Sequence, residues 1–490
     1  MAIYQMIRQL NGGGGSAVIN PLSVSVNGTY SAPEGVDGYN PVEVAVPMPS
    51  GTYSIGANGD YDIASYASVA VSVPTGVFPS GTSNITANGV YDVTNYESAS
   101  VNVSGGGGDT KFAELVARGA TSYEDSTVTT IGGYAFYSYT GLTSVSFPNA
   151  TSIGQSAFYG CTGLTDASFP NVTYIDGRAF ESCGNLTTAN FPKCETVFGY
   201  AFTNCSALSS ISFPSAKTLG ANAFSNCDSL TTAIFPEVTS FNGGFWGCDN
   251  LATISFPKAT RVPESAFRAC FALESAEFPS ATLIYSNAFN NCSNLTTAIF
   301  PIATSIYGSA FANCSKLTTL SFPSVTSIGA YAFASCSSLA TINFPNVTSL
   351  NSYAFGYCNS LTSVSLPEVT SVSGSAFAFC SNLSNIELPK ATYFSSYAFG
   401  NCEKLATVSL PKVTTLGGYA FNKCYNLLSL YLMGSTIPPL ATTVFASTPI
   451  SNYTTSTGGV HGSIFVPASL YNTYITSYNW SLYSARIVSV

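Results

Sequence analysis

The chain has 490 residues, of which 46% are hydrophobic and 13% aromatic, so it can bury a large core. Only 8% are charged, against roughly 25% in an average globular protein. Much of the surface must therefore be hydrated through the uncharged polar groups of Ser, Thr, Asn, Gly and Tyr. A net charge of −9 with only 15 Lys and Arg argues against nucleic acid as a partner, and no run of apolar residues is long enough for membrane insertion.

The first fifteen residues combine a short amphipathic start with a run of four glycines at 12–15. The start has one arginine, no continuous apolar stretch and no small-residue cleavage site, so we expect no secretory signal. Glycine runs behave as flexible hinges. We therefore interpret residues 1–15 as an N-terminal anchor peptide followed by a hinge.

Three weaker repeats follow, and they predict a β-stalk over residues 16–104. Each repeat has an Asn-Gly pair, at 27–28, 58–59 and 88–89, then a Tyr two residues after the Gly and a closing Val-x-Val run. Asn-Gly between alternating segments is the strongest short signal for a hairpin. We expect three tandem small β-modules here.

A second glycine run at 105–108 begins a linker and N-terminal helical cap, which we expect over residues 105–130. The sequence DTKFAELVARGA places Asp109 at a helix start, Phe112, Leu115 and Val116 on one face, and Gly119 as a stop. Such a helix would cover the open first coil of a repeat array.

A repeat of 22 residues governs the next segment. Its marker is Phe, spaced by 22 throughout except for one step of 21, at positions 136, 158, 180, 202, 224, 245, 267, 289, 311, 333, 355, 377, 399 and 421. Leu follows six residues after each Phe, and Pro follows twelve residues after it in every coil but the last. This regularity predicts fourteen stacked coils.

Within one coil, the stretch LATINFP has the alternation of a short strand with one buried face, and Pro345 marks where the coil leaves the sheet. A single coil cannot bury its apolar face, so neighbours must stack in register. The predicted fold is mainly β: a solenoid over residues 131–434, preceded by the stalk and closed by a capping module at 435–490, where Pro467 marks a helix start.

The pattern IGxYAFxxCxxLxxIxFPxxT resembles the BspA-like leucine-rich repeat, also called the Treponema pallidum type. That resemblance implies a curved solenoid with a parallel sheet, used in adhesion or recognition and not in catalysis. The stalk repeats resemble segments of tail and other structural proteins of phages and prophages of gut Gram-positive bacteria. The segment 462–487 resembles the closing module that follows such repeats in bacterial and phage proteins.

Thirteen of the fourteen cysteines share one column, three residues after Phe, and only Cys194 lies off it. Disulfides between adjacent coils would be close enough, but parallel side chains point the same way and an odd ladder cannot pair fully. We interpret the column as a structural ladder of free, buried thiols, which favours a reducing compartment. The ladder comprises Cys161, Cys183, Cys205, Cys227, Cys248, Cys270, Cys292, Cys314, Cys336, Cys358, Cys380, Cys402 and Cys424.

No metal, cofactor or catalytic site is predicted, and we expect no enzyme. The cysteines lack the short CxxC-type spacing of zinc ligands, and the single histidine, His461, lies in a loop outside the repeat with no nucleophile motif. Acidic residues are scattered. Glu237 and Lys258, and likewise Glu368 and Lys390, occupy one column in adjacent coils, which predicts ion pairs across the ladder.

The outward-facing positions are mostly Ser and Thr, with two exceptions. A tyrosine column two residues before Phe includes Tyr331, Tyr353, Tyr397 and Tyr419, which could stack on sugar rings or merely shield one edge of the solenoid. Around the single deletion, aromatic and charged residues concentrate, where they could bind a ligand or repair a stacking defect. The candidate ligand-binding residues near the deletion are Trp246, Arg261, Arg268 and Phe271.

These observations give one main functional hypothesis and two alternatives. The main one is a phage virion fibre or adhesin, assembled in the bacterial cytoplasm, held by other virion proteins at its N-terminal region and presenting the solenoid to a host-surface or mucosal glycan or protein. Resemblance to other fibres implies a homo-oligomer such as a trimer. The alternatives are a cell-surface adhesin of a bacterium or protist, and a capsid or tail decoration protein without receptor specificity.

Overall fold

A computed structural model describes residues 119–451 and 461–490, together with the backbone of five short strands between residues 22 and 91. The chain divides into two units, Met1–Arg118 and Gly119–Val490. The anchor peptide, both glycine runs and the expected helix after Asp109 lie outside the described residues. Among the described residues no helix is long and apolar enough to cross a membrane.

The described strands of the first unit form one antiparallel sheet in the order β1-β2-β3-β5-β4. The pairing of β4 with β5 flanks the third Asn-Gly pair, with Ile85 opposite Tyr91. The division of residues 16–104 into three modules stays a prediction. The bounds are β1 Leu22–Val24, β2 Thr52–Ile55, β3 Ala70–Ser72, β4 Ile85–Thr86 and β5 Val90–Tyr91.

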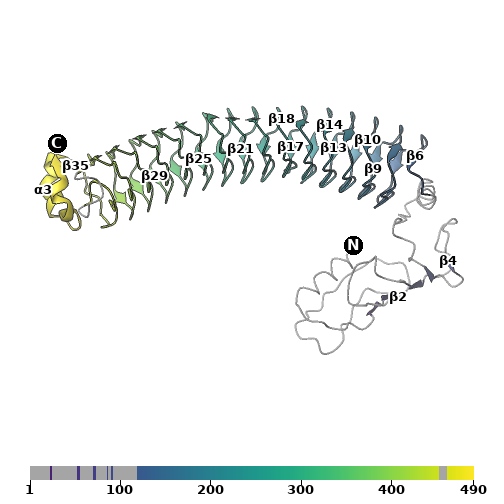
Figure 1. Cartoon of the computed structure of the whole chain (residues 1–490), viewed down its shortest axis with the longest axis horizontal. Helices are drawn as coiled ribbons and strands as arrows, with labels where there is room; N and C mark the ends of the chain where they lie inside the picture. The colour runs from purple at the N-terminus through teal and green to yellow at the C-terminus, as the bar shows by residue number, and fades with distance from the viewer. Residues whose placement is uncertain are drawn as a thin grey trace. The chain divides into compact units, whose positions relative to one another are not determined.

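The second unit is a gently curved solenoid of about 16 turns, built almost entirely from parallel strands, and this confirms the predicted mainly β fold (Figure 1). Each coil contributes a strand of two residues and then a strand of three, and strands of each kind pair with their counterparts in neighbouring coils to form several parallel sheets. In coil 333, named like the others after its repeat Phe, Ser327–Ile328 (β25) precedes the turn and Thr341–Asn343 (β26) follows it.

The three-residue strands are β6 Ser122–Glu124, β8 Ser144–Ser146, β10 Asp166–Ser168, β12 Thr188–Asn190, β14 Ser210–Ser212, β16 Thr232–Ile234, β18 Thr253–Ser255, β20 Ser275–Glu277, β22 Thr297–Ile299, β24 Thr319–Ser321, β26 Thr341–Asn343, β28 Ser363–Ser365, β30 Asn385–Glu387, β32 Thr407–Ser409 and β34 Ser429–Tyr431. The two-residue strands are β7 Thr130–Ile131, β9 Ser152–Ile153, β11 Tyr174–Ile175, β13 Thr196–Val197, β15 Thr218–Leu219, β17 Ser240–Phe241, β19 Arg261–Val262, β21 Leu283–Ile284, β23 Ser305–Ile306, β25 Ser327–Ile328, β27 Ser349–Leu350, β29 Ser371–Val372, β31 Tyr393–Phe394 and β33 Thr415–Leu416.

Two aromatic columns fill the core. The repeat Phe residues are fully buried and stack on one another, with ring centroids 5.3 Å apart between Phe311 and Phe333 and again between Phe333 and Phe355. The residue before each Pro forms a second column, whose rings meet the first edge to face, as Phe322 meets Phe333 at 6.0 Å. Such aromatic pairs contribute about 0.5–1.5 kcal/mol each beyond their buried area.

Threonine hydroxyls reinforce the register on the outside. In most coils, the Thr that ends the FPxxT segment donates its hydroxyl to the backbone carbonyl of the equivalent Thr one coil earlier, as Thr326 does to Thr304 at 3.3 Å and Thr392 to Thr370 at 3.2 Å. These side chains therefore join coils together. Part of the outward Ser and Thr surface is already used by the fold and is not free to bind a ligand.

The strand ladder extends beyond the expected range 131–434 at both ends. At the first end, β6 pairs with β8, and Tyr123 places its ring 5.4 Å from Phe147 and 6.1 Å from Phe136. Because this coil has Tyr in place of the aliphatic residue and lacks the AFxxC marker, the 22-residue pattern does not reveal it.

At the other end, β35 (Ser463–Val466) and β36 (Ile487–Ser489) continue the parallel sheet after β34. Between them lie the 3₁₀ helix η2 (Ala468–Leu470), the helix α3 (Tyr471–Thr476) and the 3₁₀ helix η3 (Trp480–Arg486). Pro467 immediately precedes η2, as predicted. The indole of Trp480 is buried and donates to the Pro438 carbonyl at 2.7 Å, which ties this cap to the last coil.

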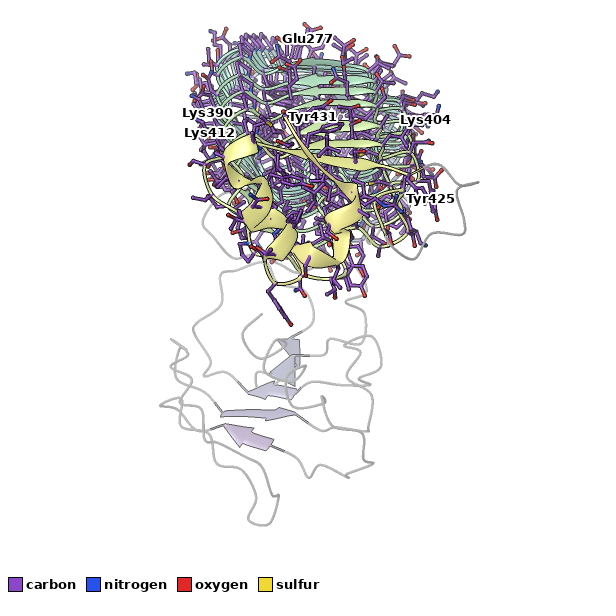
Figure 2. All side chains as sticks on the ribbon, turned by 90° about the vertical axis from the view of Figure 1, so that its left-hand side faces the viewer. Glu277, Lys390, Lys404, Lys412, Tyr425 and Tyr431 are labelled. Carbon is purple, nitrogen blue, oxygen red and sulfur yellow. The ribbon has the colours of Figure 1, made fainter. Side chains whose placement is uncertain are left out.

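The two expected ion pairs form, with 2.6 Å between Lys258 Nζ and Glu237 and 2.7 Å between Lys390 Nζ and Glu368. All four side chains are about half exposed, where such pairs contribute about 0–1 kcal/mol. Viewed from the C-terminal end, Lys390 lies on one side of the solenoid and Tyr425 on the opposite side (Figure 2).

Candidate functional site

The turn between the two strands of each coil is the surface that carries the predicted tyrosine column. Backbone hydrogen bonds join each turn to the next, and in coil 333 three of them run from the N–H groups of Tyr331, Phe333 and Ser335 to carbonyls of coil 355 at 2.8–2.9 Å. Equivalent side chains of successive turns are thereby held one above another. A residue on this face presents its side chain at a fixed step along the solenoid.

The tyrosine column forms face-to-face pairs. Tyr331 and Tyr353 stack with centroids 4.9 Å apart and planes 7° apart, and Tyr397 and Tyr419 do so at 4.9 Å and 8°. Tyr331 is 45% exposed and Tyr397 39%. In each pair, one face of each ring is covered by its partner, so only the other face and the ring edges remain for a ligand.

Two aromatic residues that the sequence reasoning missed extend this surface. Tyr357 and Phe379 lie two residues after the repeat Phe, and their rings stack at 4.5 Å and 5°. Tyr357 is also parallel to Tyr353, with centroids 6.5 Å apart. The sequence could have revealed them, because most other coils have Asn, Ser or Gly two residues after the repeat Phe. Tyr331, Tyr353, Tyr357 and Phe379 together form what we call the aromatic strip.

The second candidate group is only partly brought together. Trp246 and Arg268 directly follow the repeat Phe in adjacent coils, and the Gly247 N–H donates to the Arg268 carbonyl at 2.9 Å. Trp246 and Phe271 are each 43% exposed. Arg261 lies away from this turn on β19, where its guanidinium donates to the Asn242 side chain at 3.3 Å.

The two candidate groups are separate sites. Four coils separate Phe245 from Phe333, which is about 20 Å at the spacing of the core rings. A single small ligand therefore cannot touch both.

The deletion coincides with a break in the two-residue ladder, between β17 and β19. In most other coils the residue after this strand donates its N–H to the coil before, as Tyr285 does to Val262 at 2.9 Å. Pro263 occupies that position and has no N–H to donate to Phe241. The three-residue strands β16 and β18 still pair, and the Phe245 and Gly247 N–H groups still donate to the carbonyls of Ala266 and Arg268 in the next turn, so the coils stay joined there.

We expect backbone amides at this break to exchange hydrogen faster than elsewhere in the solenoid. Residues 242–245 should exchange at least tenfold faster than the equivalent residues 330–333, because the ladder beside them is interrupted. Hydrogen exchange with mass spectrometry measures this directly. Pro263→Tyr, which restores the donor present at Tyr285, should slow the exchange, and uniform protection in the unaltered chain would contradict the expectation.

All fourteen cysteines are buried and unpaired. Each column thiol donates a hydrogen bond to the carbonyl of the repeat Phe in the preceding coil, as Cys336 Sγ does to Phe311 at 3.2 Å. The same Phe311 carbonyl also accepts the N–H of Cys314 at 3.3 Å. The sequence reasoning treated the column as small hydrophobes only, and the structure adds this bond between coils. Cys194 instead donates to the Thr196 carbonyl at 3.3 Å.

Burial controls the chemistry of these thiols. It raises the pKa of the Cys161, Cys194 and Cys358 thiols to about 12, and that of Cys336 well above its ordinary value of 9.0. The thiolate is the reactive form. Among the described residues, no group of three His, Cys, Asp or Glu side chains could hold a metal ion, and His461 is exposed.

We expect an aromatic disulfide reagent to react slowly with the folded protein at pH 8, and with all fourteen thiols once the chain is unfolded in guanidinium. The folded rate per thiol should be at least a hundredfold below that of free cysteine. Absorbance at the wavelength of the released thiolate measures both. Fast reaction of several thiols in the folded chain would contradict the buried ladder.

Comparisons with known proteins agree with this geometry. The family described as BspA type leucine rich repeat region, in 6 copies, matches residues 129–245, 241–362, 304–428 and 348–458. No curated protein gives a significant match.

Several solved structures are similar. One is a leucine rich cell surface protein from Faecalibacterium prausnitzii, with 31% identity, 56% of this chain and 79% of that chain covered, and a TM-score of 0.38. A leucine-rich repeat protein from Bacteroides ovatus has 24% identity, 75% and 94% coverage and a TM-score of 0.47. A leucine-rich repeat protein from Eubacterium ventriosum has 23% identity, with 68% of this chain and 88% of that chain covered, and a TM-score of 0.37. With its matched segments running from residue 129 to 458, the chain belongs to the BspA-type leucine-rich repeat family.

Proposed function

We propose that this protein is a surface-displayed adhesin that uses the turn face of its solenoid to bind a glycan or protein on another surface. The observation that carries the proposal is the aromatic strip, with the Tyr397–Tyr419 pair beside it. Exposed rings are fixed there by the backbone hydrogen bonds that join successive turns. Rigid aromatic side chains lose little conformational entropy on binding, which makes them effective anchors.

Family membership supports a binding role, because stacked repeats present extended surfaces for recognition. The similar F. prausnitzii protein is described as a cell surface protein. The expectation of a phage virion rests on the stalk repeats, whose side chains lie outside the described residues, and the family match gives it no support. The proposal therefore takes the broader role, surface display with adhesion, and leaves attachment to virion proteins and trimer formation as sequence-based predictions.

The test is to incubate the fluorescently labelled full chain with intact Gram-positive gut bacteria and with mucin-coated surfaces. Saturable binding to at least one of them is expected. A variant with Tyr331, Tyr353, Tyr397 and Tyr419 all changed to Ala should keep its circular dichroism spectrum and lose at least tenfold in binding. Absence of saturable binding to every surface would show the proposal to be wrong.

A further inference from the structure

The tyrosine column has one empty place with a tyrosine on each side. In coil 377 the column residue is Ser375, while Tyr353 precedes it and Tyr397 follows it. The far faces of these two rings are covered by Tyr331 and Tyr419, so their free faces point toward Ser375 from either side. Among the described coils, no other place in the column lies between two tyrosines. We call this place the Ser375 gap.

The width of the gap follows from the core beneath it. Successive repeat rings are 5.6 Å apart between Phe355 and Phe377 and 5.5 Å apart between Phe377 and Phe399, so equivalent atoms of the outer coils are about 11 Å apart. A flat ring touching both tyrosines would need them only about 7–8 Å apart, twice a carbon–carbon contact. The gap is therefore wide enough for a ring that carries polar substituents, packed against one tyrosine with its substituents facing the other.

Phe379 bounds the gap on one side. It belongs to the same turn as Ser375 and stacks on Tyr357, whose ring is parallel to that of Tyr353. Ser375 lies between the two tyrosines and is only 8% exposed. The gap is thus bounded by aromatic rings, with the Ser375 hydroxyl between them.

A glycine lies against each of the two wall rings. A Cβ at Gly356 would lie 2.9 Å from Tyr353 Cδ1, and one at Gly400 would lie 3.2 Å from Tyr397 Cδ1. Each ring therefore lies across the turn against a glycine, with its plane parallel to that of its stacked partner. This arrangement keeps the free faces turned along the solenoid axis, toward the gap.

The tyrosines also sit where the backbone disfavours them. Tyr353 and Tyr397 have φ of 54° and 57°, in the left-handed region, and Phe379 has 64°. Bulky residues pay about 1–2 kcal/mol there, whereas Asn, Ser and Gly, which fill most other coils at these positions, pay less. Local backbone preference does not account for a cluster of aromatics at such sites.

We propose that the Ser375 gap binds one pyranose ring of a neutral glycan, an inference that rests on the proposed adhesin function and names its ligand class. The C–H groups on one face of a sugar chair pack against the free face of one tyrosine, and the sugar hydroxyls occupy the remaining width of the gap toward the other tyrosine. Two phenol hydroxyls and the Ser375 hydroxyl are present to hydrogen-bond its hydroxyls. The residues that bound the gap carry no charge, which favours a neutral sugar over an anionic one.

The decisive variant is Ser375→Tyr, which fills the gap. The new ring would join the four tyrosines in one continuous stack. A tyrosine is compatible with this turn, because Tyr331 has the same backbone conformation and is likewise followed three residues later by an alanine, Ala334. The fold should therefore be kept while the sugar is excluded. Isothermal titration of the full chain with cellohexaose, maltohexaose and mannohexaose measures the effect. At least one should bind the unaltered chain, and Ser375→Tyr should raise its Kd at least tenfold.

Two further variants separate the gap from the rest of the surface. Tyr397→Ala removes one wall and should also raise the Kd at least tenfold, with unchanged circular dichroism. Tyr307→Ala removes an equally exposed tyrosine, stacked on Tyr285 outside the column, and should change the Kd less than twofold. A hexamer of galacturonic acid should bind at least tenfold more weakly than the best neutral hexamer.

The outcomes distinguish this inference from the function on which it rests. If no neutral hexamer binds, or Ser375→Tyr binds as tightly as the unaltered chain, the sugar site is wrong. If Ser375→Tyr still labels bacteria or mucin as the unaltered chain does, the adhesin function stands and only the sugar site fails. If the hexamers bind at the gap but no cell or mucin surface is labelled, the sugar site stands and adhesion fails.

Discussion

The solenoid should lose stability steeply between pH 9 and pH 10. Burial raises the pKa of thirteen cysteine thiols above the ordinary value of 9.0, while the unfolded chain ionises its thiols near that value. In this window the folded state therefore holds more protons than the unfolded chain. The stability that these thiols contribute is fully present below pH 9 and is lost as the pH rises toward their folded pKa values.

The expected size is large. Each thiol lowers the free energy of unfolding by about 1 kcal/mol between pH 9 and pH 10, so thirteen together remove on the order of 10 kcal/mol. That is a large part of the stability of a domain of this length, at roughly 0.05–0.15 kcal/mol per residue.

Urea midpoints at pH 8, 9, 9.5 and 10, in the presence of a reductant, measure this loss. Cys336→Ala and Cys358→Ala should each reduce the slope of stability against pH by one proton, because each removes one titrating group. Cys→Ala also leaves a small cavity and removes the thiol's hydrogen bond between coils, so both variants should be less stable than the unaltered chain at pH 7. A midpoint that stays constant from pH 8 to pH 10 would contradict the assignment of the ladder.

Phe333→Ala should destabilise the solenoid by about 3–5 kcal/mol. Phe333 is fully buried and touches four other rings, Phe311 and Phe355 in its own column and Phe322 and Phe344 in the other. Its removal leaves a cavity that the strands on either side cannot close without breaking their register. Urea unfolding followed by circular dichroism gives the free energy.

Phe271→Ala is the matched control, because Phe271 is the same residue type but 43% exposed. It should cost less than about 1 kcal/mol. Phe333→Leu should fall between the two, since Leu366 and Leu388 already replace Phe in the second column without interrupting the coils. Equal effects of Phe333→Ala and Phe271→Ala would show that the stacked rings are not the main support of the fold.

The sequence predicted the recurring part of this fold well. The repeat Phe, the Leu that follows it and the column cysteines are all buried, and the Glu237–Lys258 and Glu368–Lys390 pairs form across adjacent coils. These features are readable because an in-register stack repeats the same environment every 22 residues. A column of identical residues in the sequence then reports a column of identical contacts.

The candidate site was only partly readable. Tyr331, Tyr353, Tyr397 and Tyr419 were identified from their column, but Tyr357 and Phe379 belong to a different column that the sequence gives no reason to connect with it. Arg261 was grouped with Trp246 because they are close in sequence, yet it lies on a strand rather than on the turn. Grouping by sequence distance fails here because each coil turns its successive residues toward different sides.

The sequence alone determined the period, the buried columns and the family, because these depend on which residue recurs at each place. Only the tertiary structure decided the thiol bond to the Phe carbonyl of the preceding coil, the ladder break at Pro263 and the two tyrosine faces turned toward Ser375. Each of these depends on backbone groups or ring faces from different coils meeting in space. The order of residues in the sequence does not show which of these groups come into contact, because the contacts form only when the coils stack.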